Sequence, residues 1–202
     1  MKIYETSTAP NPRRVRIFLA EKGIDMEYVQ LDIVNGENLN PEMRIKNATT
    51  KIPFLELDDG TCIGETIAIC RYFEETHPEP ALMGSTALEK AQIEMWQRRA
   101  ELNFMNMVGM CFQHTTGYFK DRMTPVAEWG VEAGKNAVEF MDLAEQQLAE
   151  NTYLAGETFS VADITLLCAL DFARVVKIKP SDKHTNIQRW YELVSSRPSA
   201  KA

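Results

Sequence analysis

A proline directly in front of an expected strand is the first position that suggests chemistry. Pro53 follows Ile52 in the segment KIPF, and the next residues have the pattern of a strand. A cis bond before Pro53 would turn the amide and carbonyl of Ile52 outward, where an extended peptide can pair with them as an added strand. The alternative is an ordinary strand-entry proline.

The second candidate is the segment Gly64-Glu65-Thr66, at the start of an expected helix. A helix N-terminus has free amides and the positive end of the dipole, so with the Thr66 hydroxyl it suits an α-carboxylate. Glu65 suits the ammonium beside such a carboxylate. Alternatively, Glu65 only complements the dipole and Thr66 only caps the helix.

The hydrophobic pattern of the first 75 residues predicts the elements that position these segments, in the order β-α-β-α-β-β-α. Strands are expected at residues 2–4, 26–33, 54–57 and 61–63, and helices at 15–22, 41–47 and 65–75.

Residues 77–86 are rich in proline and loose in pattern, and no strand pattern follows them. Helices are expected at 87–119, 126–150, 161–176 and 185–195, with Ser160 and Asp163 as a capping box for the third. The sequence therefore predicts an α/β domain over residues 1–76, a linker over 77–86 and an all-helical domain over 87–202.

Composition and charge exclude several classes of protein. The 202 residues include 22 Lys and Arg against 29 Asp and Glu, a formal charge of −7, which argues against nucleic acid as the main partner. No apolar run is long enough for a membrane span, and no signal peptide is visible. Four dispersed cysteines and three dispersed histidines argue against a disulfide framework or a metal site. A cytoplasmic location is expected.

In combination, these features resemble the cytosolic glutathione S-transferase superfamily, most closely its bacterial and fungal branch related to the yeast enzymes. The resemblance extends over essentially the whole chain. It rests on four motifs, which are KIPFLELDDGTCIGETIAICRYF at 51–73, the linker at 77–84, FSVADIT at 159–165 and RWYELVSSRP at 189–198.

The resemblance implies a thioredoxin-like N-terminal domain that binds glutathione as a co-substrate, with no metal or pyridine cofactor. It implies a cis Pro53, pairing of Ile52 with the cysteinyl part, and contacts from Glu65 and Thr66 to the γ-glutamyl end. Lys51 and Asn38 complete the expected glutathione-binding set, although relatives often carry His or Lys near the position of Asn38. A homodimer is also implied.

The residue that activates the thiol departs from the family pattern. A free thiol has a pKa near 8.5, and the family usually lowers it with a hydroxyl or a cysteine near the first helix. The aligned residue here is Ala9, which has no donor. Ser7, Thr8, Asn11 and the more distant His114 are the candidate replacements, and a plain loop role for Ser7 and Thr8 is the alternative.

The resemblance also implies an apolar site for the second substrate. Met107, Cys111, His114 and Tyr118 follow helical spacing within the expected helix over 87–119, and Met110 lies beside them. Met107, Met110, Cys111 and Tyr118 are the candidate electrophile site; the alternative is that the stripe is simply core.

The function expected from the sequence is transfer of the glutathione thiolate to small, largely apolar electrophiles. The rivals are a non-enzymatic ligand carrier or interaction module of the same fold, and a glutathione-dependent peroxidase. Donor chemistry near Ala9 distinguishes the carrier from the two enzymes.

Overall fold

The computed structural model describes residues 1–202, and they form two compact units. The first unit is Met1–Leu82 with Pro198–Ala202, and the second is Met83–Arg197. The predicted boundary differs at the C-terminus, because the last five residues pack with the first unit. There Arg13 Nη2 donates to the Ala200 carbonyl at 2.9 Å, and the Ser199 hydroxyl donates to the Glu21 carboxylate.

The first unit has the predicted order of elements and confirms the α/β fold class. Its four-stranded sheet runs β2-β1-β3-β4; β1 and β2 are parallel, and the other two pairs are antiparallel. The elements are β1 (Lys2–Glu5), α1 (Pro10–Glu21), β2 (Glu27–Gln30), a 3-10 turn (Glu37–Leu39), α2 (Pro41–Lys46), β3 (Phe54–Glu56), β4 (Cys62–Ile63), α3 (Thr66–Thr76) and a C-terminal 3-10 turn (Pro198–Lys201).

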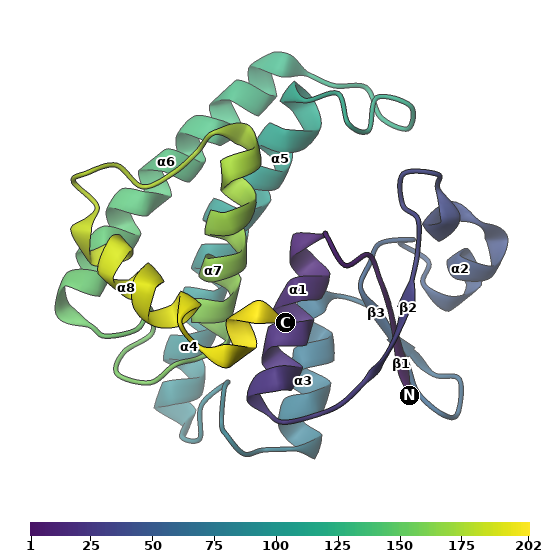
Figure 1. Ribbon diagram of the computed structural model, residues 1–202, viewed down its shortest axis with the longest axis horizontal. Helices are drawn as coiled ribbons and strands as arrows, with labels where there is room; N and C mark the ends of the chain where they lie inside the picture. The colour runs from purple at the N-terminus through teal and green to yellow at the C-terminus, as the bar shows by residue number, and fades with distance from the viewer. The chain divides into compact units, whose positions relative to one another are not determined.

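Helices cover both faces of this sheet, with α1 and α3 on one side and α2 on the other (Figure 1). Strand residues alternate between the faces, so neighbours in β1 enter different cores. Tyr4 joins Leu31, Met43 and Phe54 in one hydrophobic cluster, and its ring stacks on Phe54 with centroids 4.4 Å apart. The fully buried Ile3 points to the opposite face.

An ion pair fastens α2 to the sheet. Lys46 Nζ lies 2.7 Å from Glu56 and 3.0 Å from the Tyr4 hydroxyl, which itself donates to Glu56 at 2.7 Å. Hydrogen bonds to Glu56 and Tyr4 raise the pKa of Lys46, and the Lys46 ammonium lowers the pKa of Glu56. Both groups are therefore charged at neutral pH.

The first helix begins earlier than the pattern predicted. Helix α1 starts at Pro10 rather than at Val15, with Ala9 as the residue before it. Pro10 occupies the first helical turn, where its missing amide hydrogen costs nothing and its φ suits a helix. The apolar periodicity starts only at Val15, so it could not locate the first turn.

The segment after α3 is held against the end of α1. The buried Lys22 ammonium lies 2.7 Å from Glu74 and donates to the carbonyls of His77 and Pro80 at 2.7 and 2.8 Å. The Glu79–Pro80 bond is cis, which the sequence did not predict. These contacts explain why the first unit continues to Leu82.

The second unit is entirely helical, as predicted, around the almost completely buried α7. Eleven of its thirteen residues are buried, so α7 has no solvent-facing side, which is typical of a central core helix. Its elements are α4 (Ala87–Ala100), a π-helical turn (Glu101–Met105), α5 (Asn106–Thr115), α6 (Ala127–Glu150), α7 (Val161–Ala173), a 3-10 turn (Arg174–Val176) and α8 (Thr185–Ser195).

The single helix predicted over 87–119 was wrong in its extent. It contains a π-helical turn, and α5 ends at Thr115. The hydroxyls of Thr115 and Thr116 donate back to the carbonyls of Cys111 and Phe112 at 2.6 and 2.7 Å, and Gly117 has a φ of +69°. A left-handed residue ends a helix, so Tyr118 lies beyond it.

The capping box at the start of α7 is confirmed, with Asp163 reaching back to the Ser160 amide at 3.0 Å. No helix is both long and apolar enough to cross a bilayer.

Candidate functional site

The peptide bond before Pro53 is cis, as the sequence analysis predicted. Ile52 is half-buried immediately before β3, and neither its amide nor its carbonyl has a hydrogen-bond partner within the protein. A backbone donor and acceptor in this state can pair with an extended peptide.

The loop in front of Ile52 is held by two asparagine side chains. Asn47 Nδ2 donates to the Lys51 carbonyl at 2.8 Å, and Asn38 Nδ2 donates to the Thr50 carbonyl at 2.7 Å. Thr50 itself has a left-handed φ of +55°. Asn38 therefore shapes the loop, and the exposed Lys51 offers the cation beside Ile52.

The oxygen of Asn38 is a buried acceptor without a partner in the protein. A ligand carboxylate needs donors, and one of the two Asn38 amide hydrogens is already used by Thr50. This arrangement suits support of the loop better than direct contact with glutathione, which is the contact that the sequence analysis expected of Asn38.

The N-terminus of α3 has no side-chain cap. Thr66 is 7% exposed, and its hydroxyl has no hydrogen-bond partner within the protein. Glu65, just before the helix, is exposed and has a φ of +66°, a backbone conformation rare outside glycine and common at functional sites. The helix start thus presents free donors to an acceptor.

The two segments are neighbours in space. A Cβ atom on Gly64 would lie 3.4 Å from Asn47 Oδ1, and Asn47 holds the loop that carries Ile52. The loop that carries Ile52 and the start of α3 therefore lie side by side in the first unit.

Ser7 lies in the exposed loop between β1 and α1. Its amide donates to Gln30 Oε1 at 2.9 Å, and its carbonyl accepts from Arg16 Nη2 at 2.9 Å. Its hydroxyl has no partner within the protein and is a free donor.

Asn11 is less available than Ser7. Its side-chain oxygen accepts from Arg14 Nη1 at 3.1 Å, and the Arg14 side chain is buried. Only the amide nitrogen of Asn11 can still donate to a ligand.

His114 lies in the last turn of α5, in the second unit. Its Nδ1 accepts the Val126 amide hydrogen at 3.0 Å, so the neutral ring carries its own hydrogen on Nε2. This tautomer is assigned from the hydrogen bond, and it leaves Nε2–H as the donor.

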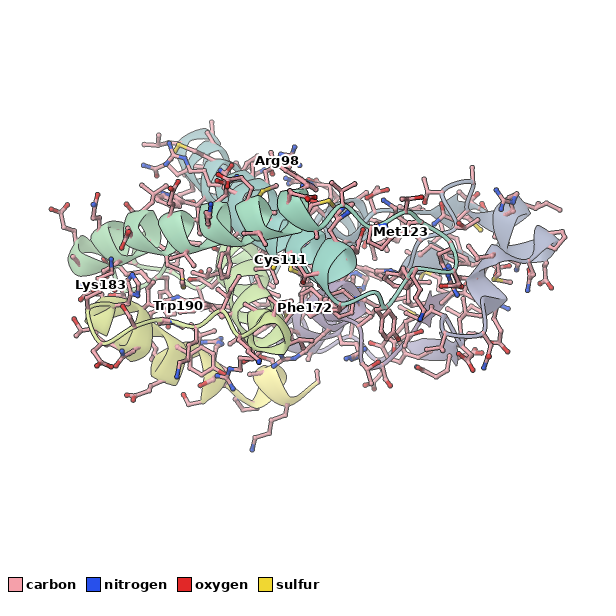
Figure 2. The ribbon with its side chains drawn as sticks, turned by 90° about the horizontal axis from the view of Figure 1, so that it is seen from above. Arg98, Cys111, Met123, Phe172, Lys183 and Trp190 are labelled. Carbon is pink, nitrogen blue, oxygen red and sulfur yellow. The ribbon has the colours of Figure 1, made fainter.

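The four candidate electrophile residues do not share one environment. Met107 and Met110 are half-buried on α5, whereas Cys111 is 8% exposed and lies inside the helical unit (Figure 2). A Cβ atom on Gly134 of α6 would lie 3.2 Å from the Cys111 sulfur, so Cys111 packs between helices. Tyr118, beyond the helix end, is 48% exposed.

Sequence reasoning missed an aromatic cluster around Tyr118. Its ring centroid is 5.2 Å from that of Phe112 and 4.8 Å from that of Phe119, and Phe172 of α7 lies 5.3 Å from Phe112. All four rings are partly exposed. No periodic signal could have found the cluster, since it joins a turn to two separate helices.

Comparison with known proteins identifies the family of both halves of the chain. Residues 3–81 match the family model described as glutathione S-transferase, N-terminal domain, and residues 130–198 match glutathione S-transferase, C-terminal domain. Glutathione S-transferase 2 of Saccharomyces cerevisiae is 38% identical, over all of this chain and 88% of its own length.

Solved structures extend the similarity to the fold. The crystal structure of Gtt2 from Saccharomyces cerevisiae superposes with a TM-score of 0.95, covering 100% of this chain and 99% of the yeast chain at 38% identity. A glutathione S-transferase domain-containing protein of Marinobacter aquaeolei VT8 also gives 0.95, covering 98% and 99% of the two chains at 39% identity. With both halves matched by family models and a full-length relative well above 30% identity, the chain belongs to the glutathione S-transferase family.

Proposed function

We propose that this protein transfers the thiolate of glutathione to small, largely apolar electrophiles. One observation carries the proposal, namely the unpartnered backbone of Ile52 beside the uncapped start of α3. The Ile52 backbone can pair with an extended peptide, and the start of α3 can bind a carboxylate. A γ-glutamyl tripeptide has both of these groups.

Each part of glutathione has a chemically suitable partner in the first unit. The γ-glutamyl carboxylate would bind the α3 amides and the Thr66 hydroxyl, and Glu65 would hold its ammonium. The cysteinyl part would pair with Ile52, and Lys51 would attract the glycyl carboxylate. Glutathione is a co-substrate in this proposal, and no metal or bound cofactor is assigned.

Thiol activation requires a hydrogen-bond donor beside the sulfur. Ser7 is the leading candidate, because its hydroxyl is unpartnered. Asn11 keeps one amide group for this task, and the Nε2–H of His114 could orient a water; both roles stay predictions. The thiolate attacks the electrophile to form the new S–C bond, and a leaving group or a proton-accepting carbon takes up the electron pair. Positioning the two substrates supplies the rest of the rate enhancement.

The proposed preference for apolar electrophiles rests on residues of the second unit. Met107 and Met110 are partly exposed thioether side chains, which adapt to different shapes, and the rings of Phe112, Tyr118 and Phe119 add aromatic surface. These residues would favour small apolar compounds. Cys111 is assigned a packing role instead.

A homodimer and a cytoplasmic location are part of the same proposal. Leu88 and Met95 of α4 are 68% and 40% exposed and lie seven residues apart on one side of that helix. An exposed apolar stripe of this kind suits a second copy of the chain. Sedimentation of Met95→Lys beside wild type tests the contact, because a dimer that uses α4 should become a monomer. None of the four cysteines is in a disulfide, and reduced thiols suit a reducing compartment.

Titration of glutathione into Thr66→Ala and Glu65→Gln tests the binding assignment. Loss of a hydrogen bond to a charged group costs about 1.5–3 kcal/mol, so each variant should bind at least about ten-fold more weakly. Thr76→Ala and Glu75→Gln, at the far end of the same helix, are matched controls that should bind normally. Unchanged affinity in both test variants would refute the assignment.

A conjugation assay with a chromogenic electrophile then separates the rival functions. The absence of a donor at Ala9 is the observation that favours a carrier without activity. A carrier would bind glutathione and show no conjugation, whereas a peroxidase would consume peroxide at the expense of glutathione.

A further inference from the structure

A buried carboxylate lies next to the loop that carries Ser7. Glu5, the last residue of β1, is only 2% exposed. One of its oxygens lies 2.5 Å from Arg16 Nη1, and the other accepts from Gln30 Nε2 at 2.7 Å. A buried charge requires such partners, so Glu5 fixes the positions of both side chains.

Both partners of Glu5 also bind the backbone of Ser7. Arg16 Nη2 donates to the Ser7 carbonyl at 2.9 Å, and the Ser7 amide donates to Gln30 Oε1 at 2.9 Å. Four hydrogen bonds therefore close a ring through Ser7, Gln30, Glu5 and Arg16. We call the side chains of Glu5, Arg16 and Gln30 the Ser7 clamp.

The clamp specifies one arrangement of its polar groups. Gln30 must direct its oxygen to the Ser7 amide and its nitrogen to Glu5, since the reverse orientation would place like groups together. Arg16 uses two nitrogens of a rigid planar group, one for each partner. A lysine could not hold both positions with the same geometry.

The hydroxyl of Ser7 is the one polar group of this residue that the clamp leaves free. Loops on the surface are ordinarily mobile, whereas a donor that acts on a sulfur must be held within about 0.5 Å of its working position. The clamp holds the backbone on both sides of the Ser7 side chain, and the Thr6 hydroxyl adds a bond to the Leu31 carbonyl at 2.5 Å.

From this ring we infer that Glu5, Arg16 and Gln30 are positioning residues that hold the Ser7 hydroxyl on the sulfur of bound glutathione. They act through Ser7 and do not touch the sulfur. The inference rests on the proposed function, and within it on Ser7 as the donor.

The decisive variant is Gln30→Leu, which removes both hydrogen-bonding groups of the Gln30 side chain and leaves Glu5 and Arg16 in place. The thiolate absorbance of enzyme-bound glutathione, followed against pH, reports the pKa of the thiol. We expect Gln30→Leu to raise that pKa by up to about one pH unit, which lowers the thiolate fraction below the pKa by up to about ten-fold. Glutathione affinity should change by less than about two-fold, because the contacts to Ile52 and Thr66 are untouched. The matched control is Gln188→Leu, an equally exposed glutamine of α8, which should leave the titration unchanged.

Arg16→Lys is the second variant, with Arg71→Lys on the exposed side of α3 as its control. It should shift the titration in the same direction as Gln30→Leu. With two independent variants, the inference can still be tested if one of them does not fold.

A double-substitution cycle with Ser7→Ala separates positioning from mere stabilisation. When Ser7 has no hydroxyl, Gln30→Leu should cause no further shift in the thiol titration, although it can still lower the melting temperature. A shift that persists in the Ser7→Ala background would overturn the inference, as would an unchanged titration in Gln30→Leu and Arg16→Lys.

Failure of the inference can be told apart from failure of the proposed function. If wild type binds glutathione and Ser7→Ala moves the titration, but the clamp variants do not, only the clamp is wrong. If wild type does not bind glutathione, the proposed function fails and the inference fails with it.

Discussion

Substitution of Asp163 by asparagine should remove much of the stability of the helical unit. Asp163 is fully buried, and its two oxygens accept four hydrogen bonds. Oδ1 accepts from the Leu154 amide and from Trp190 Nε1, both at 2.8 Å; Oδ2 accepts from the amide and the hydroxyl of Ser160, both at 3.0 Å. Burial raises the pKa of Asp163, and these four donors oppose that rise.

The size of the effect follows from this geometry. Asparagine has the same shape, but its NH₂ group must replace one oxygen and then faces two donors. Two hydrogen bonds to a charged acceptor are worth about 3–6 kcal/mol together, and relief from burying a charge offsets a part. We expect a net loss of about 3–5 kcal/mol, which is large against a total stability of about 5–15 kcal/mol. For a chain of this size the melting temperature should fall by about 6–20 °C.

Thermal unfolding followed by circular dichroism at pH 7 measures this loss. Asp142→Asn is the matched control, because Asp142 is half-exposed and pairs with Lys183 at 2.9 Å and His184 at 3.1 Å. An exposed pair should contribute no more than about 1 kcal/mol. Trp190→Phe, which removes one of the four donors, should fall between the two (Figure 2 labels Trp190 on α8). A melting temperature for Asp163→Asn equal to that of the control would refute the reasoning.

Three further predictions concern the helical unit. Gly130→Ala should cost about 1–3 kcal/mol in chemical denaturation, because the new Cβ would lie 2.7 Å from Thr115 Cγ2; an unchanged midpoint would contradict this close packing. Burial alone would raise the pKa of Glu145, but hydrogen bonds from Asn186 and Ile187 at the start of α8 lower it overall. Its stabilisation is therefore present above the unfolded pKa of about 4.3 and is lost as pH falls through the folded value. Melting temperatures measured across pH should be lower for Glu145→Gln than for wild type at pH 7, and they should fall less between about pH 5 and 3. If the melting temperatures of the two proteins fall in parallel, this assignment of Glu145 is wrong. Ser160→Ala should lower stability by about 0.5–2 kcal/mol and keep the activity of the folded protein, so lost turnover without a lower melting temperature would contradict a structural role.

Local patterns in the sequence were sufficient for the class of fold and for two segments of the candidate site. Alternating and helical periodicities predicted the order of elements in the first unit and the all-helical class of the second, because each element must bury one face. The proline before β3 and the Gly64-Glu65-Thr66 segment indicated the Ile52 backbone and the start of α3. These signals depend on neighbours within a few residues, so they are visible in a single sequence.

Features that depend on distant residues were decided only by the tertiary structure. Tyr118 fits the spacing of α5, but the helix ends at Thr115, and Tyr118 instead joins an aromatic cluster that includes Phe172. The C-terminal Ala200 pairs with Arg13 of the first unit across most of the chain length. Spacing carries no information about which turn a helix ends on or which distant segment covers it.

The surroundings of Ser7 illustrate the same limit at the candidate site. The sequence identified Ser7 as a donor from its nearness to Ala9, yet Glu5, Arg16 and Gln30 each have an ordinary position within their own element. The side chains of Glu5 and Gln30 meet because β1 pairs with β2, and Arg16 reaches them because α1 packs beside the end of β1. Hydrogen bonds between side chains need contact within about 3 Å, and contact at that range is a property of the folded backbone rather than of residue spacing.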